Sequence, residues 1–295
     1  MKIFITGGSG FIGQYLSFAF SQKREVLSQY FSNKYDIPNA RQIRLDIRDE
    51  NSLKQAVEEF SPDVIIHTAA VSKPAVAEKL GKEKVFAVNV EPVKTLAEIS
   101  NSINAKLIFF STDLVYDGEN NRLKKEIDEL KPVSIYAESK VEAEKTVSRF
   151  AENYLILRIA LHYGLPLFGG SNFFAEMSRN LSEGKKVRLF TDQYRTPLEV
   201  SETPELIEKL LQTNVANEII NFGGGERISR YELGMLLAEI CSFDKNLIEP
   251  ITTDEVKSNI LVKDVSMDTS KLKSYGITIR SVSENLERIC GKLKN

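Results

Sequence analysis

The sequence predicts an α/β fold, a doubly wound parallel sheet with a smaller, interleaved C-terminal lobe. A glycine-rich turn at residues 6–13 joins an apolar run at 3–5 to a helical pattern at 11–18. Short apolar runs then alternate with amphipathic segments through roughly the first 165 residues, a pattern typical of a parallel sheet covered on both faces. With 295 residues and 42% apolar content, the chain can bury a large core.

The turn at residues 6–13 has the composition of a phosphate cradle. Gly7 permits a positive φ, Gly10 lets a pyrophosphate approach the backbone, and Gly13 lets the helix pack closely on the strand. Phe11 and Ile12 begin the helix, whose N-terminus offers unpaired N–H groups to an anion. The turn therefore predicts a dinucleotide-binding domain of the Rossmann type.

The remaining elements follow in order. Strands are predicted at 25–30, 42–45, 64–67, 106–110 and 155–159, and helices at 51–60, 86–99 and 133–149. Beyond residue 164 the pattern loosens, with helices predicted at 173–181, 203–211, 229–241 and 281–293 and strands at 187–190 and 218–222. We therefore expect a dinucleotide-binding domain at 1–164, to which 202–225 returns, and a mainly substrate-binding lobe at 165–295.

Charge and cysteine content exclude several classes of protein. Lys and Arg number 39 against 41 Asp and Glu, so no strong basic field attracts nucleic acid or an anionic membrane. Cys241 and Cys290 are too few for a disulfide framework, and no apolar stretch has the length of a membrane span. We expect a cytoplasmic protein that binds a small molecule.

The loop after the second predicted strand bears on cofactor preference. It carries no carboxylate to bind ribose hydroxyls, whereas Ser32 and Lys34 could hold a 2′-phosphate. This favours NADP(H), and the alternative is an ordinary solvated loop that also accepts NAD(H). Asp46 and Ile47 follow the third strand, where an adenine contact is expected, although Asp46 could equally cap a turn.

A reactive group is predicted where two later segments reach the carboxyl edge of the sheet. Thr112 closely follows the strand at 106–110, and Tyr136 and Lys140 lie four residues apart on one helix face. An ammonium near a phenol lowers its pKa, and the Thr112 hydroxyl can bind the same substrate oxygen. These three groups suit carbonyl reduction.

Taken together, the motifs resemble those of the extended short-chain dehydrogenase/reductase family, and within it dTDP-4-dehydrorhamnose reductases and related sugar-nucleotide reductases. The matches are Thr6-Gly7-x-x-Gly10-x-x-Gly13, Asp46-Ile47, His67-Thr68-Ala69-Ala70, Val88-Asn89-Val90, Ser111-Thr112-Asp113, Tyr136-x-x-x-Lys140, Asn172-Phe173 and Asp192-Gln193-Tyr194-Arg195-Thr196-Pro197.

The resemblance implies hydride transfer from NAD(P)H to the keto carbon of a nucleotide-linked 4-keto-6-deoxysugar, with Tyr136 as proton donor. It adds Ala69, Ala70 and Asn89, besides Tyr136 and Lys140, to the cofactor-binding residues. It further implies substrate contacts from Ser72, Asp113, Asn172 and Arg195, with the Arg195 guanidinium on the nucleotide diphosphate. A surface salt bridge is the alternative role for Arg195.

Some positions depart from the family pattern. Leu161 stands where rhamnose-pathway reductases usually carry Trp, and Ala75 stands where they tend to carry Asp. Leu114 replaces the Glu of 4,6-dehydratases, which disfavours dehydration. A nucleotide-sugar 4-epimerase and a non-catalytic, cofactor-binding regulatory subunit stay open as alternatives. No ligand cluster assigns a metal, and a homodimer is compatible with the resemblance.

Overall fold

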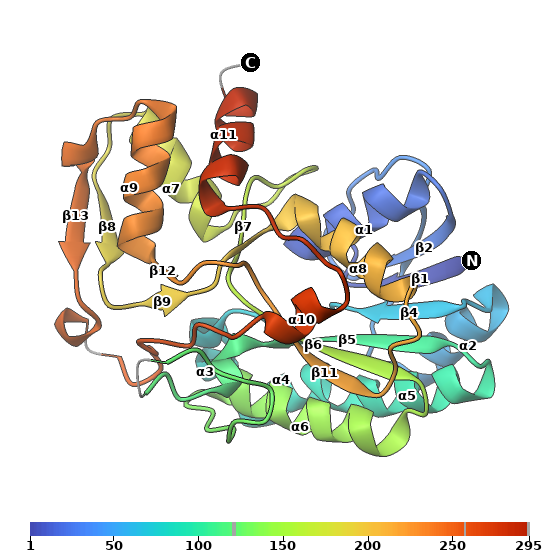
Figure 1. Cartoon of the computed structure of the whole chain (residues 1–295). Coiled ribbons are helices and arrows are strands. Elements are labelled where there is room, and N and C mark those ends of the chain that lie inside the picture. Colours follow the sequence, from blue (N-terminus) through green and yellow to red (C-terminus); the bar gives the residue numbers. More distant parts are fainter. Residues whose placement is uncertain (120–121, 257, 294–295) are drawn as a thin grey trace.

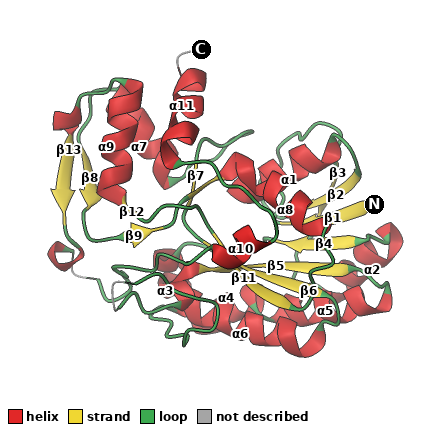
Figure 2. Ribbon diagram, in the orientation of Figure 1, coloured by secondary structure: helices red, strands yellow, loops and turns green. Residues whose placement is uncertain are grey.

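A computed structural model describes residues 1–119, 122–256 and 258–293. At its centre lies a seven-stranded, wholly parallel sheet with the order β11-β6-β5-β4-β1-β2-β3 (Figures 1 and 2). The strands are β1 (Lys2–Thr6), β2 (Glu25–Tyr30), β3 (Arg41–Arg44), β4 (Val64–His67), β5 (Lys106–Thr112), β6 (Tyr154–Ile159) and β11 (Glu218–Phe222). The predicted fold class is confirmed, because a doubly wound parallel sheet forms the core.

Helices cover both faces of this sheet (Figure 1). Ile3 and Ile5 of β1 point to one face, where they pack with Leu16, whereas Phe4 points to the other and packs with Leu53. The first face is covered by α1 (Phe11–Ser21) and α8 (Thr203–Leu211), and the second by α2 (Glu50–Phe60), α5 (Glu91–Ser102) and α6 (Ile135–Phe150). Both faces are thus apolar and buried, as the near-continuous apolar strands require.

A smaller lobe packs around its own core. Its elements are α7 (Phe173–Ser182), β8 (Val187–Phe190), α9 (Arg230–Cys241), β13 (Ile248–Ile251) and α11 (Val282–Leu293). Short strand pairs lead to it from the sheet: β7 (His162–Tyr163) with β10 (Leu198–Glu199), and β9 (Tyr194–Arg195) with β12 (Ile228–Ser229). The chain crosses between the two parts several times, since α8 packs on the large sheet and β11 is one of its strands, while elements before and after them belong to the lobe.

Some helices differ from their predicted bounds. The helix predicted at 86–99 is divided into α4 (Lys82–Asn89) and α5, because Pro92 lies in the first turn of α5 and its ring is incompatible with a continuous helix. A helix that we did not predict, α3 (Pro74–Leu80), follows β4. The remaining short elements are α10 (Ser270–Ser274), η1 (Asp113–Val115), η2 (Val200–Glu202), η3 (Lys245–Leu247) and η4 (Thr253–Glu255).

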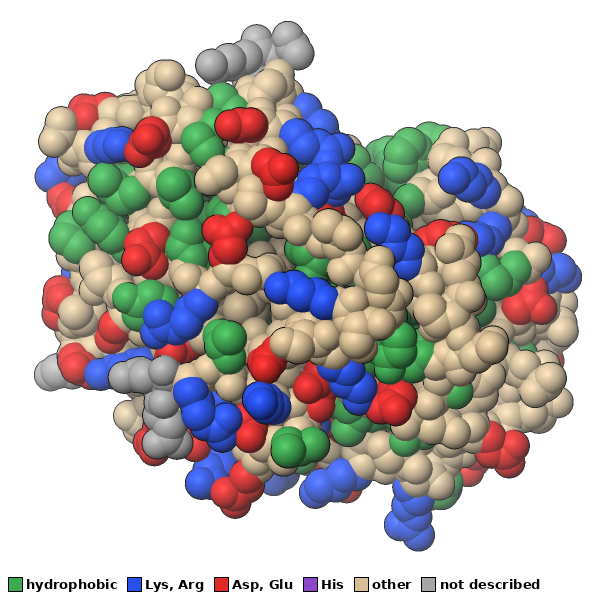
Figure 3. Space-filling model, in the orientation of Figure 1, with side chains coloured by type: hydrophobic (Ala, Val, Ile, Leu, Met, Phe, Trp, Pro, Cys, Tyr) green, Lys and Arg blue, Asp and Glu red, His purple; other side chains and the backbone are tan. Residues whose placement is uncertain are grey.

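Charges of both signs are interspersed on the face shown in Figure 3. Across the described parts of the chain, no helix combines the length and apolar character needed to cross a membrane. Within those same parts, no group of three or more His, Cys, Asp and Glu side chains could hold a metal ion.

Candidate active site

The glycine turn between β1 and α1 has the geometry of an anion cradle. Gly7 has a φ of +68°, and its carbonyl accepts a 2.8 Å hydrogen bond from the Gly10 N–H. A Cβ at Gly13 would lie only 2.1 Å from the Gly7 carbonyl oxygen, so no larger residue fits there. Gly10 caps α1 without any side-chain hydrogen bond to the first turn. The first N–H groups of α1 are therefore available to a phosphate.

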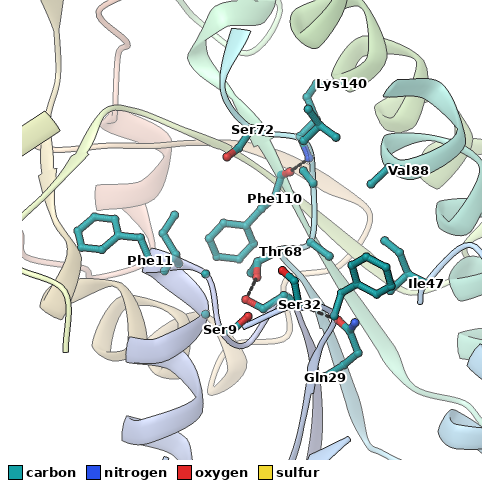
Figure 4. Close-up of a pocket in the computed structure, with 18 of the residues that line it drawn as sticks. Ser9, Phe11, Gln29, Ser32, Ile47, Thr68, Ser72, Val88, Phe110 and Lys140 are labelled. Carbon is teal, nitrogen blue, oxygen red and sulfur yellow. Dashed lines mark hydrogen bonds between the residues drawn. The ribbon is translucent and has the colours of Figure 1, made fainter. Parts of the chain in front are cut away.

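A cavity of about 580 Å³ extends from this turn to Lys140 (Figure 4). Most of the residues predicted to bind the cofactor line it: Gly7, Gly10, Phe11, Ile12, Gly13, Ser32, Asp46, Ile47, Ala69, Ala70, Tyr136 and Lys140. The cavity thus joins the glycine turn, the ends of β2 and β3, the loop after β4, and α6. The closely packed turn and the open helix terminus fit a dinucleotide.

Two predicted cofactor residues do not line this cavity. The Lys34 side chain is 57% exposed, and its Nζ lies 3.9 Å from Asp36. The Asn89 side chain is buried, where its Oδ1 accepts from the Val71 N–H at 2.8 Å and its Nδ2 donates to the Ser139 hydroxyl at 2.9 Å. Asn89 therefore ties the loop after β4 to α6 instead of contacting the cavity.

Gln29 and Arg48 line the cavity, although the sequence analysis did not single them out. The Gln29 Oε1 atom accepts the Gly7 N–H at 2.8 Å, which fixes the glycine turn to β2. The Arg48 Nε donates to Asp46 at 2.9 Å, and this hydrogen bond lowers the pKa of the Asp46 carboxyl. The position of Arg48, directly after Asp46-Ile47, is the signal that could have identified it.

Tyr136 and Thr112 face each other. Ser134 caps α6 by accepting from the Ala137 N–H at 3.2 Å, which places Tyr136 in the first turn. Thr112 ends β5, and the interaction of its hydroxyl with the Tyr136 phenol opposes the effect of burial on the pKa of that phenol. Burial raises the pKa of Tyr136 above its ordinary value, and the nearby Asp113 raises it further.

Lys140 lies one helical turn beyond Tyr136. Its Nζ donates to the Phe110 carbonyl at 2.7 Å, as Figure 4 shows, and lies 4.5 Å from the centre of the Phe109 ring. Burial lowers the pKa of Lys140 to about 7, against the opposing effect of Glu144. The expected lowering of the Tyr136 pKa by Lys140 is wrong for this structure, because desolvation dominates and the ammonium is directed at a backbone carbonyl.

A second cavity, of about 380 Å³, adjoins the first and shares Ser72, Tyr136 and Ile159 with it. The Tyr136 phenol therefore lies at the junction of the two cavities. Thr112, Leu114 and the apolar segment Ile260, Leu261 and Val262 form further parts of the wall.

Two charged side chains of the second cavity, Asp113 and Arg195, are buried. Asp113 accepts from the Thr112 hydroxyl at 3.2 Å, and burial raises its pKa. The Arg195 Nε lies 3.6 Å from the Asp113 carboxylate, while its other nitrogens donate to backbone carbonyls. Arg230, which the sequence analysis missed, also lines this cavity.

Of the predicted substrate residues, Ser72, Asp113 and Arg195 line the second cavity and Asn172 does not. Asn172 caps α7, where its Oδ1 accepts from the Ala175 N–H at 2.9 Å and its Nδ2 donates to the Gly164 carbonyl at 3.1 Å. The Asn172 side chain therefore stabilises the start of α7 and the loop before it.

Comparison with known proteins supports the resemblance. Methionine adenosyltransferase 2 subunit beta from Xenopus laevis is 25% identical over 293 residues, covering 95% of this chain and 84% of that protein. The solved dTDP-4-dehydrorhamnose reductase from Bacillus anthracis, in complex with NADP, is 25% identical with a TM-score of 0.84 and covers 99% of each chain. A hypothetical dTDP-4-dehydrorhamnose reductase from Sulfolobus tokodaii is 30% identical with a TM-score of 0.80, covering 93% of this chain and 94% of that one.

These likenesses extend over nearly the whole chain, and the predicted resemblance to dTDP-4-dehydrorhamnose reductases and extended short-chain dehydrogenases/reductases is confirmed. The family described as the RmlD substrate binding domain matches residues 1–295, and this chain belongs to that family.

Proposed function

We propose that the protein is an NAD(P)H-dependent reductase of a nucleotide-linked 4-keto-6-deoxysugar. One observation carries the proposal: the Tyr136 phenol lies where the two cavities meet, and Thr112 lines the second cavity beside it. A carbonyl oxygen in the second cavity can accept from both hydroxyls when the Thr112 hydroxyl turns from Asp113 toward it, while the first cavity holds the cofactor. When bound, the cofactor supplies the hydride.

The proton chemistry of Tyr136 favours reduction. Burial raises the pKa of this phenol, so the proton stays on Oη in the neutral range and is available to the oxygen of a reduced carbonyl. The Thr112 hydroxyl orients that oxygen. Lys140 lies against the cofactor cavity with its Nζ fixed on the Phe110 carbonyl, which keeps it one turn from the phenol.

We propose NADP(H) as the preferred cofactor and NAD(H) as the alternative. Ser32 supports this preference because it lines the cavity. Lys34 does not line it, so we propose Arg48 as the cation that binds the 2′-phosphate. A cation is needed there because the 2′-phosphate carries negative charge. The B. anthracis relative was solved with NADP.

Nicotinamide fluorescence tests the proposed reaction with dTDP-, UDP- and GDP-linked 4-keto-6-deoxysugars. Fluorescence should fall with at least one of them, and Tyr136→Phe should lower kcat by about 10²–10⁴-fold with the NADPH dissociation constant unchanged. A Tyr275→Phe variant is the control, because Tyr275 lies outside both cavities. Turnover of a nucleotide sugar without net cofactor oxidation would instead favour the 4-epimerase.

A second candidate is a cofactor-binding subunit without activity of its own. It is favoured by the 25% identity to methionine adenosyltransferase 2 subunit beta, which is named as a subunit. The assembled group of Thr112, Tyr136 and Lys140 favours the enzyme. A stable partner in a pull-down, together with no turnover of any nucleotide sugar, would support the subunit.

A further inference from the structure

Arg230 is held rigidly at the wall of the second cavity. It is the first residue of α9, after a capping box in which the Ser229 hydroxyl accepts from the Glu232 N–H at 3.1 Å and Glu232 accepts from the Ser229 N–H at 2.7 Å. Its guanidinium carbon lies 4.3 Å from the centre of the Phe173 ring. The helix cap and the aromatic contact fix the direction of the side chain.

The Arg230 guanidinium does not use all of its hydrogen-bond donors within the protein. Its Nε is buried and has no hydrogen-bond partner. Burial and the positive charge of Arg195 together lower the pKa of Arg230 to about 10, against the opposing effect of Asp113. Leaving a buried donor without a hydrogen-bond partner costs free energy. The Arg230 Nε is therefore a candidate for ligand binding.

Arg195 offers a contrast within the same cavity. Its Nη1 donates to the carbonyls of Tyr194 at 2.6 Å and Lys263 at 3.1 Å, and its Nη2 donates to the Val262 carbonyl at 3.2 Å. Through these bonds the guanidinium holds β9 against the segment 262–263. Arg195 is therefore largely committed to the protein, although it still contributes charge.

Asp113 supplies an unpaired acceptor beside the unpaired donor. Its Oδ2 is buried without a hydrogen-bond partner, since 3.6 Å to the Arg195 Nε is too long for one. Two guanidinium groups thus face one carboxylate in a cavity that also contains Thr112 and Tyr136. The surplus of positive charge favours an anionic ligand, and the Asp113 Oδ2 can accept a hydrogen bond from a ligand hydroxyl.

We propose that Arg230, and not Arg195, is the specificity-determining residue that binds an anionic oxygen of the substrate, while Asp113 accepts from a neighbouring hydroxyl. The inference rests on the proposed function, whose nucleotide-sugar substrates contain both groups. A phosphoryl oxygen and a sugar carboxylate share the required chemistry, because a guanidinium binds either through charge-assisted hydrogen bonds.

The test measures binding of inorganic pyrophosphate, UDP and glucuronate to the full chain saturated with NADPH, by calorimetry at low salt. Pyrophosphate and UDP report a phosphoryl site, and glucuronate reports a carboxylate site. We expect Arg230→Gln to weaken binding of at least one of them tenfold or more, and Arg230→Lys to weaken it less. Arg179→Gln is the matched control, since Arg179 is an exposed arginine on α7 of the same lobe.

Equal affinities of the unaltered chain and both Arg230 variants, or no binding of any probe, would overturn the inference. So would a tenfold loss in Arg195→Gln with none in Arg230→Gln. If Arg230→Gln fails to fold, the Lys variant and a crystal structure of the unaltered chain with UDP test the inference instead. The inference requires an anionic oxygen of UDP within 3.5 Å of the Arg230 nitrogens. Failure of the proposed reaction is distinguishable, since it would leave Arg230-dependent binding without hydride transfer.

Discussion

The two adjoining cavities offer their ligands different groups. Around the glycine turn the first cavity presents backbone N–H groups at the start of α1, whose close packing requires Gly13. The second cavity presents charged side chains, the buried Asp113 and Arg195 and the half-buried Arg230. The first arrangement is encoded within eight consecutive residues, whereas the second combines the ends of β5, β9 and α9. A local motif therefore specifies the cofactor end, and tertiary packing specifies the substrate end.

The buried ion pair of Arg158 and Glu144 should show the largest effect on stability. The Arg158 Nη2 donates to the Glu144 carboxylate at 2.8 Å, and Glu144 also accepts from the Ser111 hydroxyl, next to Thr112. Glu144→Gln leaves the Arg158 charge without compensation, so the free energy of unfolding should fall by about 3–5 kcal/mol, as measured by urea denaturation.

Glu142 on the same helix provides the control for that change. Its pair with Lys145 is exposed, so Glu142→Gln should alter the free energy of unfolding by less than about 1 kcal/mol. If the two variants were equally stable, the stability of the fold would not depend on this buried charge.

At the cofactor end the decisive change is a single methyl group. Because a Cβ at Gly13 would lie 2.1 Å from the Gly7 carbonyl, Gly13→Ala should displace the turn, reduce NADPH affinity at least tenfold and cost about 1–3 kcal/mol of stability. Fluorescence titration with NADPH and thermal unfolding measure the two effects. Normal NADPH affinity in this variant would disprove the assigned role of the turn.

Gly291 serves as the matched position. Nothing lies within 4 Å of a Cβ there, and it is in α11. Gly291→Ala should raise the free energy of unfolding by about 0.5–1 kcal/mol, since Ala is the better helix former, and leave NADPH binding unchanged.

Lys140, in the wall of the first cavity, should make stability depend on pH. Its pKa falls from about 10.5 in the unfolded chain to about 7 in the folded protein. Between these values the unfolded chain binds more protons, so the unfolding free energy should rise with pH above 7, by at most about 1.4 kcal/mol per pH unit. Lys140→Met lacks this contribution, and denaturation of both proteins from pH 7 to 10 measures it.

The unfolding free energy of the Met variant minus that of the unaltered protein should therefore decrease as the pH rises from 7 to 10. Parallel stability curves over the same range would mean that Lys140 retains an ordinary pKa in the folded protein.

Much of the large sheet could be predicted because its signals are local. Apolar runs and the glycine turn depend on neighbouring residues, and all seven strands of the sheet lie at or close to their predicted positions. The helix predicted at 86–99 was wrong in its continuity, because Pro92 outweighs the apolar period there.

The site was less predictable because its electrostatics depend on distances that spacing does not encode. The pKa of Tyr136 rises instead of falling, since burial outweighs the charge one turn away. Lys34 has a suitable position in the sequence, yet its side chain is directed to solvent and Asp36. Arg230 gave no signal in the sequence, because nothing local to α9 indicates that its first residue faces Asp113.

Deuterium transfer tests the central claim, that a ketone lies between Tyr136 and Thr112 beside the cofactor. NADPH deuterated at the transferable position would be incubated with nucleotide-linked 4-keto-6-deoxysugars, and the product examined by mass spectrometry and NMR. We expect one deuterium on the former keto carbon for each NADPH consumed. Folded protein that binds both NADPH and the ketosugar but transfers no deuterium would contradict the claim.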